Sequence, residues 1–191
     1  MGNNMLNDLP AERAILAGIF RYGAEAYYDV ADIVTESSFT DESNVVLFSC
    51  MKHVLETDDS RSLDAPTMMS AAKELGFSDF FNTQEVQHMS SVIKFPVLLE
   101  NLRKFGAKVR KLEIARMMYD QLDLTKERYL EIKGDEPIAK ILGIAEDAVM
   151  DVTSVIAGED ESPTQMFDDV EAHLEELAED SVDQIGIATG F

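Results

Sequence analysis

The sequence predicts an all-α protein. A compact helical domain is expected first, then a long antiparallel helical hairpin, and finally a separate amphipathic helix. Almost every informative segment repeats its apolar residues with a helical period, whereas no stretch alternates convincingly as a strand. Proline, aspartate and glycine stand where helices are expected to begin and end, which supports the same conclusion.

Residues 1–96 are expected to form the compact domain, with five short helices. Each helix carries an apolar stripe on one face, as in the third, where Leu47, Met51 and Val54 recur at helical spacing. The second helix is expected over residues 24–34. The other start and stop signals are Pro10, Ser43 or Asn44, Asp64 with Pro66, Gly76 and Thr83.

Residues 97–157 are expected to form the hairpin. In its first helix, about 97–122, apolar residues alternate in spacings of four and three, and only Arg116 interrupts the series. A polar turn with Gly134 leads into a second helix over about 136–156. Isolated hairpins bury little apolar surface, so we expect this one to associate with a second copy. The alternative is that it folds back onto the five-helix domain as a plain bundle.

Residues 158–184 are expected to form an acidic linker that contains an amphipathic helix. The chain has a formal net charge of −21, and residues 141–191 hold fourteen acidic residues and no lysine or arginine. Thr164 is a fair N-cap for a helix of about 15 residues with one apolar face. Such an acidic segment repels nucleic acid and suits a basic partner surface, although a merely solvated linker would look the same.

No catalytic, cofactor-binding or metal-binding residues are predicted. None of the ten glycines is followed by lysine, so the core of a phosphate-binding loop is missing. His53, His88 and His173 lie on separate segments, and the Glu85–His88 pair lacks a second such pair within the bundle helices. The single cysteine, Cys50, sits in an apolar helical stretch. We therefore expect a chain that is not catalytic alone.

A basic stripe lies on the first hairpin helix. Between Lys94 and Arg116 there are seven basic residues and only two acidic ones, Glu100 and Glu113. Such a stripe can contact DNA phosphates or the acidic surface of a neighbouring copy, and the scarcity of free aromatic residues favours the second. The candidate contact residues are Arg103, Lys104, Lys108, Arg110 and Lys111.

The expected location is the cytoplasm. No apolar run approaches the roughly 20 residues of a membrane span, so no membrane association is expected. The N-terminus lacks the basic and apolar regions of a signal peptide. A single cysteine cannot form an intramolecular disulfide, which fits a reducing compartment.

Four short motifs follow one another along the chain: residues 12–20 (ERAILAGIF), Ser38-Phe39, residues 63–67 (LDAPT) and residues 186–191 (GIATGF). In this order they resemble the N-terminal collar domain and linker helix of DnaB-family replicative DNA helicases. The first is similar to the opening helix of that domain, with Ala17 separating the usual Leu-Gly pair, and the next two resemble two of the family's loops. The last is similar to the entry of the family's motor domain. The strong acidity and divergent motifs suggest a phage or otherwise distant member.

The resemblance implies an assembly role. N-terminal domains of such helicases pair through their hairpins into a collar above a ring of six motors, and primase or a loader docks there. The implied pairing surface is Leu102, Phe105, Val109, Leu112, Ile141, Ala145 and Val149. The linker helix would dock on a neighbouring subunit through Phe167, Val170, Leu174 and Leu177.

The resemblance also implies where the chemistry lies. Residues 185–191 are expected to begin a RecA-like ATPase domain, and that domain would hold the ATP and Mg²⁺ and drive 5′-to-3′ unwinding. DNA would then be bound through the full-length ring. Two other functions remain open: a free-standing adaptor or inhibitor of a replicative helicase, and an acidic protein that mimics DNA.

Overall fold

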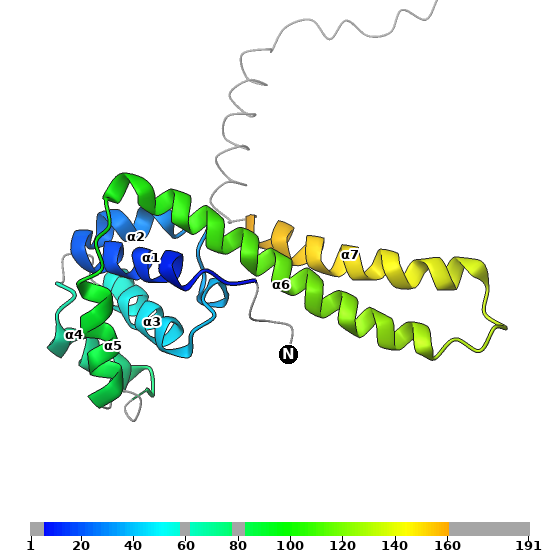
Figure 1. The fold of residues 1–191 in the computed structure, drawn as a ribbon, viewed down its shortest axis with the longest axis horizontal. Helices are drawn as coiled ribbons and strands as arrows, with labels where there is room; N and C mark the ends of the chain where they lie inside the picture. Colours follow the sequence, from blue (N-terminus) through cyan, green and yellow to red (C-terminus); the bar gives the residue numbers. More distant parts are fainter. Residues whose placement is uncertain (1–5, 58–61, 78–82, 161–191) are drawn as a thin grey trace, which may run out of the picture. The chain divides into compact units, whose positions relative to one another are not determined.

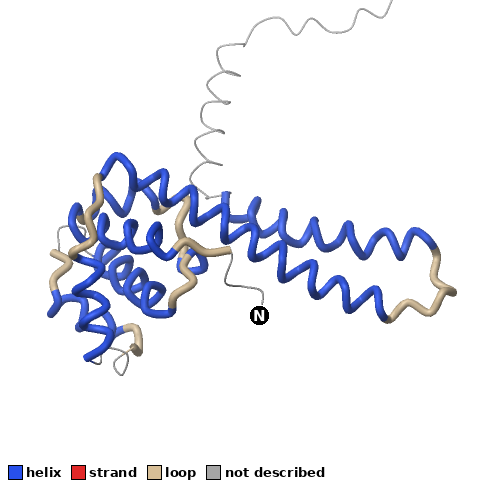
Figure 2. The backbone as a smooth tube through the Cα atoms, in the orientation of Figure 1, coloured by secondary structure: helices blue, strands red, loops and turns tan. Residues whose placement is uncertain are grey.

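The computed structural model describes residues 6–57, 62–77 and 83–160, and all regular secondary structure among them is helical (Figures 1 and 2). The predicted all-α class is confirmed. The chain divides into two compact units, Met1–Asp123 and Leu124–Phe191. The elements are α1 (Leu9–Tyr22), α2 (Ala24–Val30), the 3-10 turn η2 (Glu36–Ser38), α3 (Glu42–Thr57), α4 (Ala65–Glu74), α5 (Thr83–Ile93), the 3-10 turn η3 (Leu99–Asn101), α6 (Leu102–Leu130) and α7 (Ile138–Asp160).

The helix boundaries of the first unit follow local capping chemistry. The Asp64 side chain accepts a hydrogen bond from the backbone N–H of Thr67 at 2.9 Å, which confirms it as the N-cap of α4. Gly76 has a φ of +83°, so it provides the left-handed stop expected after α4. Helix α2 ends at Val30 rather than near residue 34, because the N–H groups of Ile33 and Val34 both bond to the Val30 carbonyl and close the helix.

The core of the first unit surrounds α1. This helix is buried on nearly all sides, and it packs against α2, α3 and α5. A helix that is apolar all round belongs in the interior. The largest side chains of the core include Ile15, Leu16 and Ile19 from α1, together with Phe48 and Met51 from α3.

The first part of α6 belongs to this same unit. Leu102 is 0% exposed and Val109 is 1% exposed, and both lie in the core cluster. Gly106 lies against Ile33, where a Cβ atom would meet the isoleucine side chain at 2.9 Å. The expected boundary at residue 96 therefore differs from the structure, which keeps α6 within the first unit as far as Asp123. Leu102, Phe105 and Val109 of α6 thus pack into the core of the first unit, whereas Tyr119 and Leu122 further along the helix are exposed.

The second unit contains the end of α6, a polar loop and α7. In that loop, Gly134 has a φ of +95°, and the Glu136 carboxylate accepts hydrogen bonds from the backbone N–H groups of Lys133 and Gly134. These backbone donors hold the pKa of Glu136 below its usual value. The Tyr129 hydroxyl donates to the Ile141 carbonyl at 3.1 Å, so α7 returns antiparallel to the last turns of α6. No helix in the described ranges has the combined length and hydrophobicity that crossing a bilayer demands.

A buried polar cluster ties α1 to its neighbours. The carboxyl group of Glu12, which is 1% exposed, accepts hydrogen bonds from the backbone N–H and hydroxyl of Thr40 and from the Asn44 amide. A ring nitrogen of His88 lies 2.9 Å from the amide oxygen of Asn44, which extends the cluster to α5. One acidic side chain thus joins α1, the loop before α3, and α3 itself.

Replacing Glu12 with alanine should lower the free energy of unfolding by about 3 kcal/mol, because two donors of Thr40 and the buried Asn44 amide lose their acceptor. Urea denaturation followed by circular dichroism measures the change. The exposed Glu100→Ala is the matched control and should change stability by less than about 0.5 kcal/mol. Equal stability of the two variants would contradict a structural role for the cluster.

Two glycine-to-alanine substitutions should change the free energy of unfolding in opposite directions. A Cβ atom at Gly18 would lie 2.2 Å from the buried Leu102 side chain, so Gly18→Ala should cost about 1–3 kcal/mol. At Gly143 nothing lies within 4 Å of the added atom, so Gly143→Ala should stabilise α7 by up to about 1 kcal/mol. Adding Leu102→Ala to Gly18→Ala should make the pair non-additive in urea denaturation, since the second change makes room for the first. A Gly18→Ala variant with the same free energy of unfolding as the wild type would contradict the close contact.

Candidate interaction surfaces

The basic stripe on α6 is largely neutralised within the first unit. Arg103 makes two hydrogen bonds to the Asp32 carboxylate, at 2.9 and 2.5 Å, and another to the Asp29 carbonyl. Lys108 forms an ion pair with Asp8, and Arg110 lies 3.0 Å from the Glu113 carboxylate. These cations hold the pKa values of Asp32 and Asp8 below their usual range, chiefly through the hydrogen bonds from Arg103 and Lys108.

The other two candidates, Lys104 and Lys111, are exposed. Lys104 lies 3.4 Å from the Asn101 amide oxygen. Three of the five predicted contact residues therefore already have a carboxylate partner in their own unit. Two exposed lysines are a small surface for phosphate contacts.

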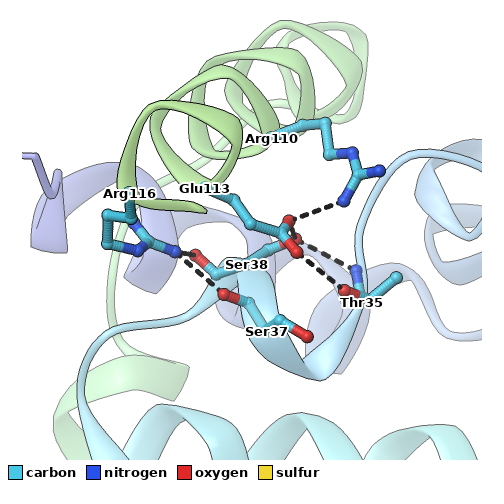
Figure 3. A network of polar contacts seen from close by, with 6 residues as sticks. All are labelled: Thr35, Ser37, Ser38, Arg110, Glu113 and Arg116. Carbon is cyan, nitrogen blue, oxygen red and sulfur yellow. Dashed lines mark hydrogen bonds and ion pairs between the residues drawn. The ribbon is translucent and has the colours of Figure 1, made fainter. Parts of the chain in front are cut away.

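Figure 3 shows how α6 is fastened to the η2 turn. Glu113 is 3% exposed, and its carboxylate accepts a hydrogen bond from the Ser38 hydroxyl at 2.7 Å. Arg116 donates to three backbone carbonyls, those of Leu6, Ser37 and Ser38. Arg116, the one interruption in the apolar series of α6, thus holds the η2 turn against the helix.

Neither Glu113 nor Glu12 was identified from the sequence as a buried contact. The available signals were weak: Glu113 is one of two acidic residues in a basic stretch, and Glu12 precedes an apolar helix. Only the tertiary contacts with Ser38 and Thr40 reveal their roles.

The structure separates the seven residues of the implied pairing surface. Leu102 and Val109 lie in the core of the first unit, and Phe105 packs against that core. Leu112 is half-buried in the same unit, so this part of the set contributes to the folding of the domain. In the second unit Ile141 is half-buried, whereas Ala145 and Val149 are exposed.

Helix α7 carries two apolar stripes. One is buried or half-buried and comprises Ile141, Ile144, Ala148 and Val152. The other, here called the exposed stripe, comprises Ile138, Leu142, Ala145 and Val149. Its members follow one another at spacings of four, three and four, as in a coiled-coil seam. Ile138 is 76% exposed and Leu142 is 59% exposed, so a large apolar surface on α7 has no cover within the described chain.

The two described histidines and the cysteine noted in the sequence lie against residues of the first unit. His53 lies 3.0 Å from Glu74 on α4, and His88 contacts Asn44. Burial raises the pKa of the Cys50 thiol to about 11, so little reactive thiolate exists at neutral pH. Within residues 6–57, 62–77 and 83–160, no three potential metal ligands come together. His173 and the four docking residues Phe167, Val170, Leu174 and Leu177 lie outside the described residues.

Comparison with known proteins agrees with this fold. The sequence model of the DnaB-like helicase N-terminal domain family matches residues 4–111. The crystal structure of the N-terminal domain of DnaB helicase from Mycobacterium tuberculosis is similar with a TM-score of 0.62, at 14% sequence identity. The alignment covers 76% of this chain and 97% of that one. No curated protein sequence matches.

The family match spans more than half of the chain and includes residues 12–20, 38–39 and 63–67, on which the resemblance was based. The structural likeness, at low identity, establishes the shared fold. Domains of this family form oligomers in the rings of replicative helicases. The chain belongs to the DnaB-like helicase N-terminal domain family.

Proposed function

We propose that this chain is the N-terminal assembly portion of a hexameric, ATP-dependent replicative DNA helicase, acting in the cytoplasm. It joins a second copy through the exposed stripe of α7, and it offers the assembled ring a surface for primase or a helicase loader. The family resemblance implies that ATP, Mg²⁺ and the 5′-to-3′ unwinding of DNA belong to the motor domains of such a ring; this sequence itself holds no phosphate-binding loop.

The single observation that carries the proposal is the exposed stripe. Val149 is 50% exposed, and with Ile138 and Leu142 it forms a continuous apolar row along one side of α7. Burying one such side chain is worth about 1.5–3 kcal/mol, and a symmetric pair buries the row twice. A second copy is the partner that offers the same heptad spacing in return.

The family relation supports the same partner. Oligomerisation in helicase rings is a property of the family's N-terminal domains, and the α7 stripe gives this chain a physical means for it. Charge does not oppose such pairing at the stripe itself, because its four members are all uncharged.

The combined substitution Leu142→Asp and Val149→Asp should weaken self-association by about 100-fold or more, because charge replaces apolar contact in both copies. Sedimentation velocity over a range of chain concentrations measures the change. Met150→Asp is the matched control: Met150 is 67% exposed on the same helix, but one residue step turns it about 100° away from the stripe.

The wild-type chain and Met150→Asp should both sediment as dimers or larger species, and the double variant as a monomer with unchanged helix content. A monomeric wild-type chain at high concentration would rule out the proposal. So would a double variant that associates as strongly as the control.

A further inference from the structure

We infer that the first unit carries a docking groove for a basic, apolar segment of a partner protein, formed by α2, the η3 turn and the start of α6. The inference deepens the recruiting role proposed above and rests on it, but it does not depend on self-association. The groove is open to solvent, has a volume of about 930 Å³ and is lined by Glu25, Asp29, Leu98, Leu99, Glu100 and Arg103.

The groove is held in shape before any partner arrives. Arg103 bonds to both the side chain of Asp32 and the carbonyl of Asp29, which joins the start of α6 to the end of α2. On the other side, Arg21 and the Tyr22 hydroxyl donate to the Val97 carbonyl. Fixing both walls in advance lowers the ordering cost of binding.

The apolar centre of the groove is Leu98. Its side chain is 59% exposed. The backbone around it is held in place, because the carbonyl of Val97 accepts hydrogen bonds from Arg21 and Tyr22 and the carbonyl of Leu98 accepts one from the Asn101 N–H at 3.1 Å. The next residue, Leu99, turns inward and packs against the core. An exposed leucine on a rigid backbone can anchor an apolar side chain of a partner.

The rim selects the charge of that partner. Three carboxylates, those of Glu25, Asp29 and Glu100, line the groove, and its one cation, Arg103, is already paired with Asp32. The rim is therefore negative in balance, and lysine or arginine side chains beside an apolar anchor complement it.

The charge of residues 141–191 does not complement the rim. Residues 141–191 contain no lysine or arginine, and their carboxylates would be repelled by the rim. The occupant is a separate protein that presents a basic amphipathic segment.

The test uses the whole chain and a fluorescein-labelled amphipathic peptide of about 14 leucine and lysine residues arranged with helical period. Fluorescence anisotropy at physiological salt measures its affinity. The paired variant Glu25→Gln and Glu100→Gln should bind about five- to tenfold more weakly, and Leu98→Ser about tenfold more weakly.

Matched controls separate the groove from the general acidity of the chain. Asp120→Asn with Glu127→Gln removes the same charge elsewhere, and Leu124→Ser removes an equally exposed leucine (64%) from the second unit. Both should bind as the wild type does. A peptide with serine in place of leucine should lose affinity for the wild type.

Equal weakening by groove variants and controls would overturn the inference, since binding would then be unspecific attraction to carboxylates. Absence of binding would also overturn it. Preferential binding of a peptide copied from residues 103–111 would instead assign the groove to a second copy of this chain. A negative peptide titration does not change the sedimentation result, and a monomeric wild type in sedimentation does not change the peptide titration. The two proposals can therefore be contradicted separately.

Discussion

The contact between Gly18 on α1 and Leu102 on α6 is the constraint on which the first unit depends. Gly18 has no side chain, so Leu102 lies so close to α1 that a Cβ atom at position 18 would clash with it. This close approach places the start of α6 over the central helix, and Gly106 repeats the arrangement against Ile33. The groove beside the start of α6, around Leu98, follows from that placement.

Hydrogen bonds from polar side chains add to the close packing of the helices. Glu113 and Arg116 hold the η2 turn against α6, and Glu12 holds the loop before α3 against α1. Each of these side chains is satisfied by partners distant in sequence, so the cost of burying it is offset only in the folded unit. Such networks favour one arrangement of the helices over looser alternatives.

The two proposed surfaces lie on different units and use different physics. The exposed stripe of α7 is uncharged and heptad-spaced, which suits a symmetric copy. The groove on the first unit combines one leucine with three carboxylates, which suits an asymmetric, basic partner. The two proposed surfaces share no residue, so substitutions can test each of them separately.

The sequence by itself determined the all-α class, the family and several helix boundaries, such as the Asp64 cap and the Gly76 stop. These depend on periodicity and capping, which act within a few residues. Only the tertiary structure decided which neighbour each apolar stripe meets. Leu102 and Ala145 look alike in a heptad pattern, yet the first is buried in the core and the second is exposed on α7. Helical spacing makes a face apolar, but contacts between residues far apart in sequence choose what covers it.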